Sequence, residues 1–170
     1  MTDNITANIC YGILSGIGAT VIFDLWGLVL KLLFKIPQSN ICYVGRWFLY
    51  MPSGKFTHSN LAKAEPLRFE CPVGWVAHYI IGSSLGVIFI FIAGNEWYSN
   101  PAIIPALLFG ILSAAAPLFI MQPAFGFGFA GSKTPNPAQT RMRSILNHFA
   151  FGLGLYITAL FINFVMNKIN

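Results

Sequence analysis

Charged side chains are scarce in this chain. They make up 9% of its 170 residues, and hydrophobic residues make up 56%, whereas soluble domains contain about 25% charged residues. So few charges cannot cover a surface that faces water, which excludes an ordinary soluble domain. The apolar runs are continuous rather than alternating, so they predict an all-α, multi-pass membrane protein instead of a membrane β-barrel.

Metal, secretory and nucleic-acid signals are missing as well. Cys10, Cys42 and Cys71 have no spacing such as C-x-x-C, so we expect three unconnected thiols, of which Cys42 and Cys71 lie reduced in a cytoplasmic link. Asp3 and the lack of Lys or Arg near it argue against a secretory signal. The net charge of +5 is not clustered, so no nucleic-acid partner is expected.

Four apolar segments predict four transmembrane helices in a single domain spanning residues 1–170. They lie at about residues 6–35, 73–93, 102–121 and 142–167, joined by links that include 36–72 and 122–141. Pro117 should kink the third helix, because proline lacks the backbone N–H that an α-helix uses. The lipid bilayer is therefore the partner that the composition requires.

The link over residues 36–72 contains a second periodic pattern. Apolar residues repeat there at helical spacing over residues 40–50, which predicts a short amphipathic helix lying at the membrane surface. A loop packed on the end of the bundle is the alternative. The first half of the other link, 122–141, is too apolar for a water-exposed loop, so we expect it to fold back into the bundle.

Orientation follows from the positions of Lys and Arg. Links 36–72 and 122–141, together with the helix ends that flank them, hold nearly all of them, and the link between the second and third helices holds none. The positive-inside rule then places both basic links in the cytoplasm and both termini outside.

Small residues and one carboxylate share a face of the first helix. Gly12, Gly16 and Asp24 are separated by multiples of four, so they lie on one slowly drifting side of the helix. Gly12 and Gly16 form one small-xxx-small pair, and Gly82 and Gly86 form a second. Both pairs predict close helix–helix contact. Asp24 lies well inside an apolar span, where a carboxylate is costly and marks a candidate functional site.

Three other polar residues are expected at the same depth as Asp24. His78 lies near the cytoplasmic start of the second helix, Gln122 at the end of the third, and His148 near the start of the fourth. The four residues together predict a polar intramembrane site, and a carboxylate between two imidazoles could relay protons. Structural hydrogen bonds between helices are the alternative. One Asp and two His are a weak metal signal, so no metal or cofactor is predicted.

The link over residues 122–141 invites comparison with nucleotide-binding loops. Gly126, Gly128 and Gly131 match G-x-G-x-x-G. That pattern binds nucleotides when a β-strand precedes it, and here a membrane helix does, so a nucleotide site is rejected.

Four cations are candidates for binding an anionic lipid headgroup: Arg46, Lys133, Arg141 and Arg143. The alternative is that these cations only anchor the links and set the orientation.

No catalytic motif is apparent, so no catalytic residue is predicted and enzymatic activity is not expected. Ser113 in particular should lie at a different depth from the histidines, which leaves no serine–histidine arrangement.

Several segments carry a family resemblance: GATVIFDLWGLVLK, VGRW, GWVAHYIIG, MQPAFGFG, SKTPNPAQTRMRS and HFAFGLGLY. Together they resemble a family of small four-helix bacterial inner-membrane proteins known as a domain of unknown function. The resemblance implies a multi-pass protein of the inner membrane of a Gram-negative-type bacterium, and it implies no activity.

Three functions fit these observations. The first is a small permease or proton-linked carrier component that uses the polar intramembrane site. The second is a membrane-embedded enzyme or lipid-headgroup-binding protein, and the third is an accessory subunit of a membrane complex. Four helices make a thin bundle, so a transport path would favour a homo-oligomer.

Overall fold

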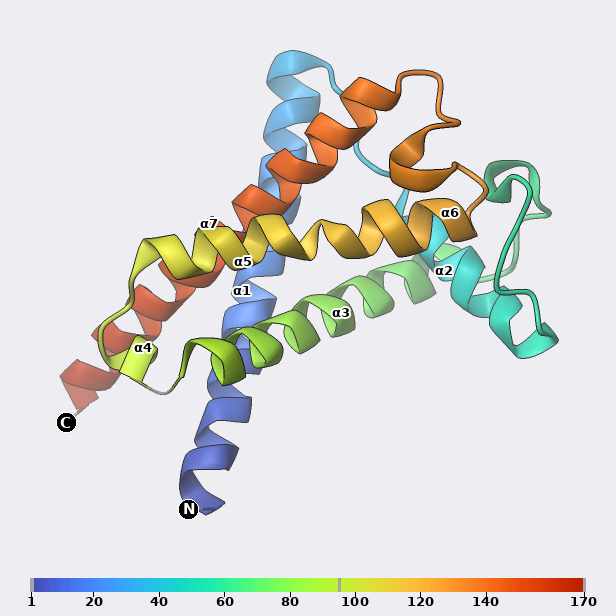
Figure 1. Ribbon diagram of the computed structural model, residues 1–170. Helices are drawn as coiled ribbons and strands as arrows, with labels where there is room; N and C mark the ends of the chain where they lie inside the picture. Colours follow the sequence, from blue (N-terminus) through green and yellow to red (C-terminus); the bar gives the residue numbers. More distant parts are fainter. Residues whose placement is uncertain (1, 95, 170) are drawn as a thin grey trace. The chain divides into compact units, whose positions relative to one another are not determined.

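The computed structural model describes residues 2–94 and 96–169, and within these ranges the chain forms helices and turns without a β-strand (Figure 1). Four helical segments are long and apolar enough to cross a membrane: Ile5–Phe34, Glu70–Ala93, Ile103–Ala124 and Pro137–Met166. They belong to α1 (Thr2–Phe34), α3 (Glu70–Ala93), the composite third span and α7 (Pro137–Ile169). The prediction of an all-α chain with four spans is confirmed.

The third span is helical but not uniform. It consists of α5 (Ile103–Ser113), the π-helical turn η3 (Pro117–Met121) and α6 (Gln122–Ala124). Because Pro117 cannot donate a backbone hydrogen bond, the α-helical pattern is interrupted near it, and wider turns are a common response. The predicted irregularity therefore appears as a π-helical turn.

The fourth span begins earlier than predicted. Asn136 caps α7, with its side-chain oxygen accepting from the Gln139 N–H at 3.1 Å. Pro137 occupies the first helical position, where a missing N–H costs nothing. The apolar pattern only starts near Met142, so periodicity alone placed the start of the helix five residues too late.

The link after α1 contains the predicted short helix, α2 (Ile41–Tyr50). Asn40 is its N-cap, accepting from the Cys42 N–H at 3.0 Å, as Asn commonly does at this position. The described residues also form four short elements: η1 (Met51–Ser53), η2 (Leu61–Lys63), α4 (Glu96–Ser99) and η4 (Phe129–Gly131).

The chain forms two compact units. The first unit contains Met1–Ile36, Tyr79–Ser113 and Asn147–Asn170, and the second contains Pro37–His78 and Ala114–Leu146.

Glycine contacts hold the helices of the first unit together. A Cβ added to Gly16 would meet the backbone of Gly82 and Ser83, and one added to Gly86 would meet that of Gly12. The two predicted small-xxx-small pairs therefore pack on each other, joining α1 to α3. In the same way, a Cβ on Gly110 of α5 would meet the backbone of α7.

The second unit has its own core, in which Leu61, Ala124 and Phe125 are buried. The Leu61 N–H donates to the Phe125 carbonyl, and the His58 N–H donates to the Ala124 carbonyl, both at 2.8 Å. The apolar start of link 122–141 therefore packs against the link that contains α2, whereas a fold back into the helix bundle was expected.

Two cysteines of the second unit correct a prediction. Cys42 of α2 and Cys71 of α3 form a disulfide, so the expectation of three unconnected thiols is wrong. Cys10 is a free cysteine and is exposed.

The disulfide forms because α2 crosses the start of α3 at close range. Gly45 and Gly74 allow close contact, because a Cβ on either one would meet the backbone of the other helix. Each cysteine stands three residues before its glycine, so this crossing also brings the two sulfur atoms together. The repeated pattern C-x-V-G, present as CYVG and CPVG, was the signal available in the sequence.

Candidate functional site

Asp24 lies in α1 and is partly buried within an apolar span of 30 residues. The Tyr79 hydroxyl of α3 donates a hydrogen bond to its Oδ2 at 3.2 Å. The glycine contacts explain this meeting. Thr20 packs against Gly82, so the next residue of the same α1 face, Asp24, meets the preceding turn of the antiparallel α3, where Tyr79 lies.

His148 of α7 lies beside α5. Its Nδ1 is 2.7 Å from the Ser113 hydroxyl, which itself donates to the Gly110 carbonyl at 2.6 Å. Because a hydroxyl has a single proton, the proton between Ser113 and His148 belongs to Nδ1. The expectation that Ser113 lies at a different depth is wrong, since the close approach of α5 and α7 at Gly110 and Gly152 brings the two together.

This serine–histidine pair has the wrong polarity for nucleophilic catalysis. A nucleophilic serine gives its proton to the histidine, whereas Ser113 receives one from it. The arrangement instead fixes the tautomer of His148, with a proton on Nδ1.

The ring of His148 also contacts α1. It meets Phe23 edge-on, with ring centroids 5.6 Å apart. Phe23 directly precedes Asp24, so the first unit brings an imidazole from α7 and a phenol from α3 to neighbouring residues of α1. Two of the four predicted site residues, Asp24 and His148, thus belong to this unit.

The other two predicted residues, His78 and Gln122, belong to the second unit. The ring of His78 packs on Trp75, with centroids 6.0 Å apart. The Gln122 Oε1 is buried without a hydrogen-bond partner, next to Gly131. Among the described residues, no group of three His, Cys, Asp or Glu side chains is placed to hold a metal ion.

Arg46 is buried in the second unit, with 5% of its surface exposed. Its Nε and Nη2 donate to the two carboxylate oxygens of Glu70 at 2.7 and 2.8 Å. Its Nη1 donates to the carbonyls of Leu61 and Ala64 at 3.0 and 2.8 Å. The hydrogen-bonded Glu70 raises the pKa of the Arg46 guanidinium. These contacts favour a structural role for Arg46 over headgroup binding.

The remaining predicted cations lie around link 122–141. Arg141 donates from Nε to the Ala130 carbonyl at 2.9 Å, and Arg143 donates from Nη1 to the Pro37 carbonyl at 2.9 Å. Lys133 and Arg141 are exposed. Gly126, where φ is +79°, makes a turn against the carbonyl of Ser59, so this glycine serves the fold.

Sequence reasoning missed Tyr79 and Ser113 as polar members of the first unit. Tyr79 stands three residues before Gly82, on the α3 face that packs on α1, and this spacing was a usable signal. The partner of Ser113 depends on the relative rise of α5 and α7, which the sequence does not contain.

Fold and site together define a multi-pass α-helical membrane protein with a carboxylate inside its first span. Residues 13–162 match the family DUF2938, described as a protein of unknown function, and the chain belongs to this family. The predicted resemblance is thereby confirmed. No curated protein and no solved structure matches the chain.

Proposed function

We propose that this protein is a small permease or proton-linked carrier component in which Asp24 binds the proton. The observation that supports the proposal is the hydrogen bond between Asp24 and Tyr79 inside the first unit. Ionisable residues within membrane spans are rare and commonly mark ion or proton paths.

The charged and the protonated form of Asp24 differ in the free-energy cost of lying within a membrane span. The charged carboxylate is expensive within a hydrocarbon layer, and the Tyr79 hydroxyl offsets part of that cost. Protonation removes the charge altogether. His148, whose ring packs beside Phe23, adds a second ionisable side chain to the first unit.

We further propose that the protein lies in a bacterial inner membrane, with both basic links in the cytoplasm. The distribution of Lys and Arg over the links supports this orientation. The Cys42–Cys71 disulfide is of a kind that the cytoplasm keeps reduced, so this orientation requires both thiols to be free in the cell. A homo-oligomer would supply a wider path than four helices provide.

Proton flux in proteoliposomes tests the role of Asp24. Vesicles containing the purified protein and a trapped pH-sensitive dye are given an outside-acid pH step. We expect the wild type to acidify the interior and Asp24→Asn to lose that flux, because an amide cannot exchange the proton. Tyr79→Phe should reduce the flux while leaving the carboxylate in place.

Glu65→Gln is the matched control, since it makes the same chemical change on an exposed acid outside the spans. Its flux should equal that of the wild type. An Asp24→Asn variant that folds, elutes as a single species and still conducts at the wild-type rate would remove Asp24 from the mechanism.

A second candidate function is binding of anionic lipid headgroups. The second unit contains seven of the ten Lys and Arg residues and only two of the five acids. Basic clusters beside membrane helices attract anionic lipids by about 1 kcal/mol per residue. Lys133 and Arg141, both exposed, are the leading contacts.

Native mass spectrometry of the protein with co-purified lipid tests this candidate. Arg141→Gln should lower the fraction of protein that carries an anionic phospholipid. Lys168→Gln, which removes an exposed cation of the first unit, should leave that fraction unchanged. Equal lipid occupancy in both variants would contradict headgroup binding at the second unit.

A further inference from the structure

Among the described residues of the first unit, two buried polar atoms have no hydrogen-bond partner. They are the indole Nε1 of Trp26 in α1 and the side-chain Oδ1 of Asn147 in α7. One can only donate a hydrogen bond and the other can only accept one. Asn147 is only 7% exposed, so lipid or bulk water does not supply its partner. An unpaired buried polar atom is costly, and such atoms call for an explanation.

The packing of α1 against α7 places the two residues at one level of the helix pair. A Cβ on Gly154 of α7 would meet Ala19 of α1, and further along, His148 contacts Phe23, so the two helices run antiparallel. Trp26 lies seven residues after Ala19, and Asn147 lies seven residues before Gly154. Seven residues are two turns and about 10 Å of helix rise, which returns nearly to the same face.

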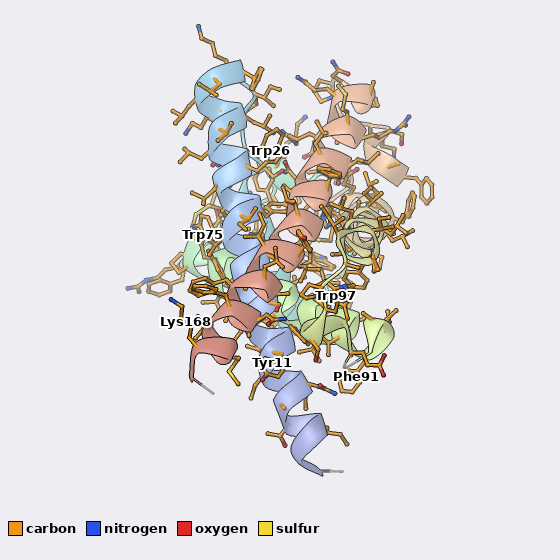
Figure 2. All side chains as sticks on the ribbon, turned by 90° about the vertical axis from the view of Figure 1, so that its left-hand side faces the viewer. Tyr11, Trp26, Trp75, Phe91, Trp97 and Lys168 are labelled. Atoms are coloured by element: carbon orange, nitrogen blue, oxygen red, sulfur yellow. A yellow bond between two sulfur atoms is a disulfide. The ribbon has the colours of Figure 1, made fainter. Side chains whose placement is uncertain are left out.

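Trp26 and Asn147 therefore face each other across the same helix pair, two turns from the glycine contact. In Figure 2, Trp26 lies on the side of α1 that is turned toward α7. A direct bond between the indole and the amide would have satisfied both atoms, and neither is satisfied. The space between them must therefore be bridged by something that both accepts and donates.

We infer that Trp26 and Asn147 bind one hydroxyl group between α1 and α7. A hydroxyl accepts from the indole N–H and donates to the amide oxygen, and no charged group is needed. Water is one source, since buried water commonly completes such pairs, and the hydroxyl of a small neutral solute is the other. The inference rests on packing and does not depend on proton transport.

Nuclear magnetic resonance of the indole N–H groups tests the site in nanodiscs. The chain has four tryptophans, and Trp26→Phe identifies the signal of Trp26 by its disappearance. A bound water should give a cross-peak between the Trp26 indole proton and water. If a solute supplies the hydroxyl, glycerol used as the probe should shift the Trp26 signal saturably while the other three tryptophan signals stay fixed.

The Asn147→Leu variant tests whether the Asn147 Oδ1 binds a hydroxyl group or is simply unpaired. The variant should abolish the cross-peak or the glycerol shift and lower the unfolding temperature, because a bridged hydrogen bond is lost. The opposite result overturns the inference: no cross-peak and no glycerol shift in the wild type, with a higher unfolding temperature for Asn147→Leu. The wild-type spectrum decides the question even if the variant does not fold.

Discussion

The Arg46–Glu70 ion pair should be costly to break in the second unit. Its side chains are only 7% and 13% exposed. Glu70 also accepts from the Leu67 N–H at 2.9 Å. Replacing Arg46 by Met removes both guanidinium hydrogen bonds to Glu70 and leaves a largely buried carboxylate. Removing one partner of such a pair typically costs about 3–5 kcal/mol of the free energy of unfolding.

A double-mutant cycle isolates the pair from its surroundings. Glu70→Leu alone leaves the guanidinium with only its two carbonyl partners, so it should also destabilise strongly. In Arg46→Met/Glu70→Leu both charges are gone, and the loss should be smaller than the sum of the single losses by about 0.5–3 kcal/mol. The double variant should remain less stable than the wild type, because the carbonyls of Leu61 and Ala64 lose their donor.

Reversible unfolding in mixed micelles, followed by tryptophan fluorescence, measures these differences. Trp47 is a suitable reporter, because its ring packs on Phe125 and its Nε1 donates to the Phe56 carbonyl in the same unit. Arg68→Met is the control, since this exposed arginine only stacks on Phe69 and should cost about 1 kcal/mol or less. A loss of unfolding free energy below about 1 kcal/mol for Arg46→Met would refute the reasoning, because a loss that small is typical of exposed ion pairs.

Three further predictions concern other contacts. Gly16→Leu should push α1 away from the Gly82 backbone and destabilise the first unit by about 1–3 kcal/mol or more in thermal unfolding, whereas an unchanged stability would contradict the close contact. In the purified, unfolded protein a maleimide should label one thiol per chain before reduction and all three afterwards, because Cys42 and Cys71 are bonded; three labels before reduction would disprove the bond. The same assay on acid-quenched cells reports which side of the membrane the link faces, since the cytoplasm keeps thiols reduced. Burial raises the pKa of the Tyr98 phenol to about 12, above its ordinary value near 10, so the folded state favours the protonated phenol. Stability should therefore be complete below about pH 10 and fall between about pH 10 and 12, and denaturant unfolding across this range should show a smaller fall for Tyr98→Phe.

Helix contacts made by small residues were the most predictable part of the interior. Gly12, Gly16, Gly82 and Gly86 follow the small-xxx-small pattern, and the structure packs one pair on the other. Such contacts are encoded locally, because spacing by four places residues on one helix face whatever the surroundings. The same logic placed Asp24 on the face that meets α3, although it did not reveal that Tyr79 would be the partner.

Cys42 and Cys71 show where local patterns were insufficient. They are 29 residues apart, and no sequence rule fixes the path of a chain over that distance. The crossing of α2 and α3 at Gly45 and Gly74 brings them together, and that crossing also buries Arg46 against Glu70. The expectation for these cysteines was wrong because it was drawn from spacing alone.

The sequence by itself determined the class of this protein, an all-α chain with four apolar spans and an acid inside the first, because length and hydropathy are properties of each segment alone. Only the tertiary structure decided the partners, Tyr79 for Asp24 and Ser113 for His148, and left the polar atoms of Trp26 and Asn147 buried without one. Those pairings depend on how far one helix is shifted along another. A shift of a single residue moves a side chain by about 1.5 Å along the axis and 100° around it, and no individual segment specifies that shift.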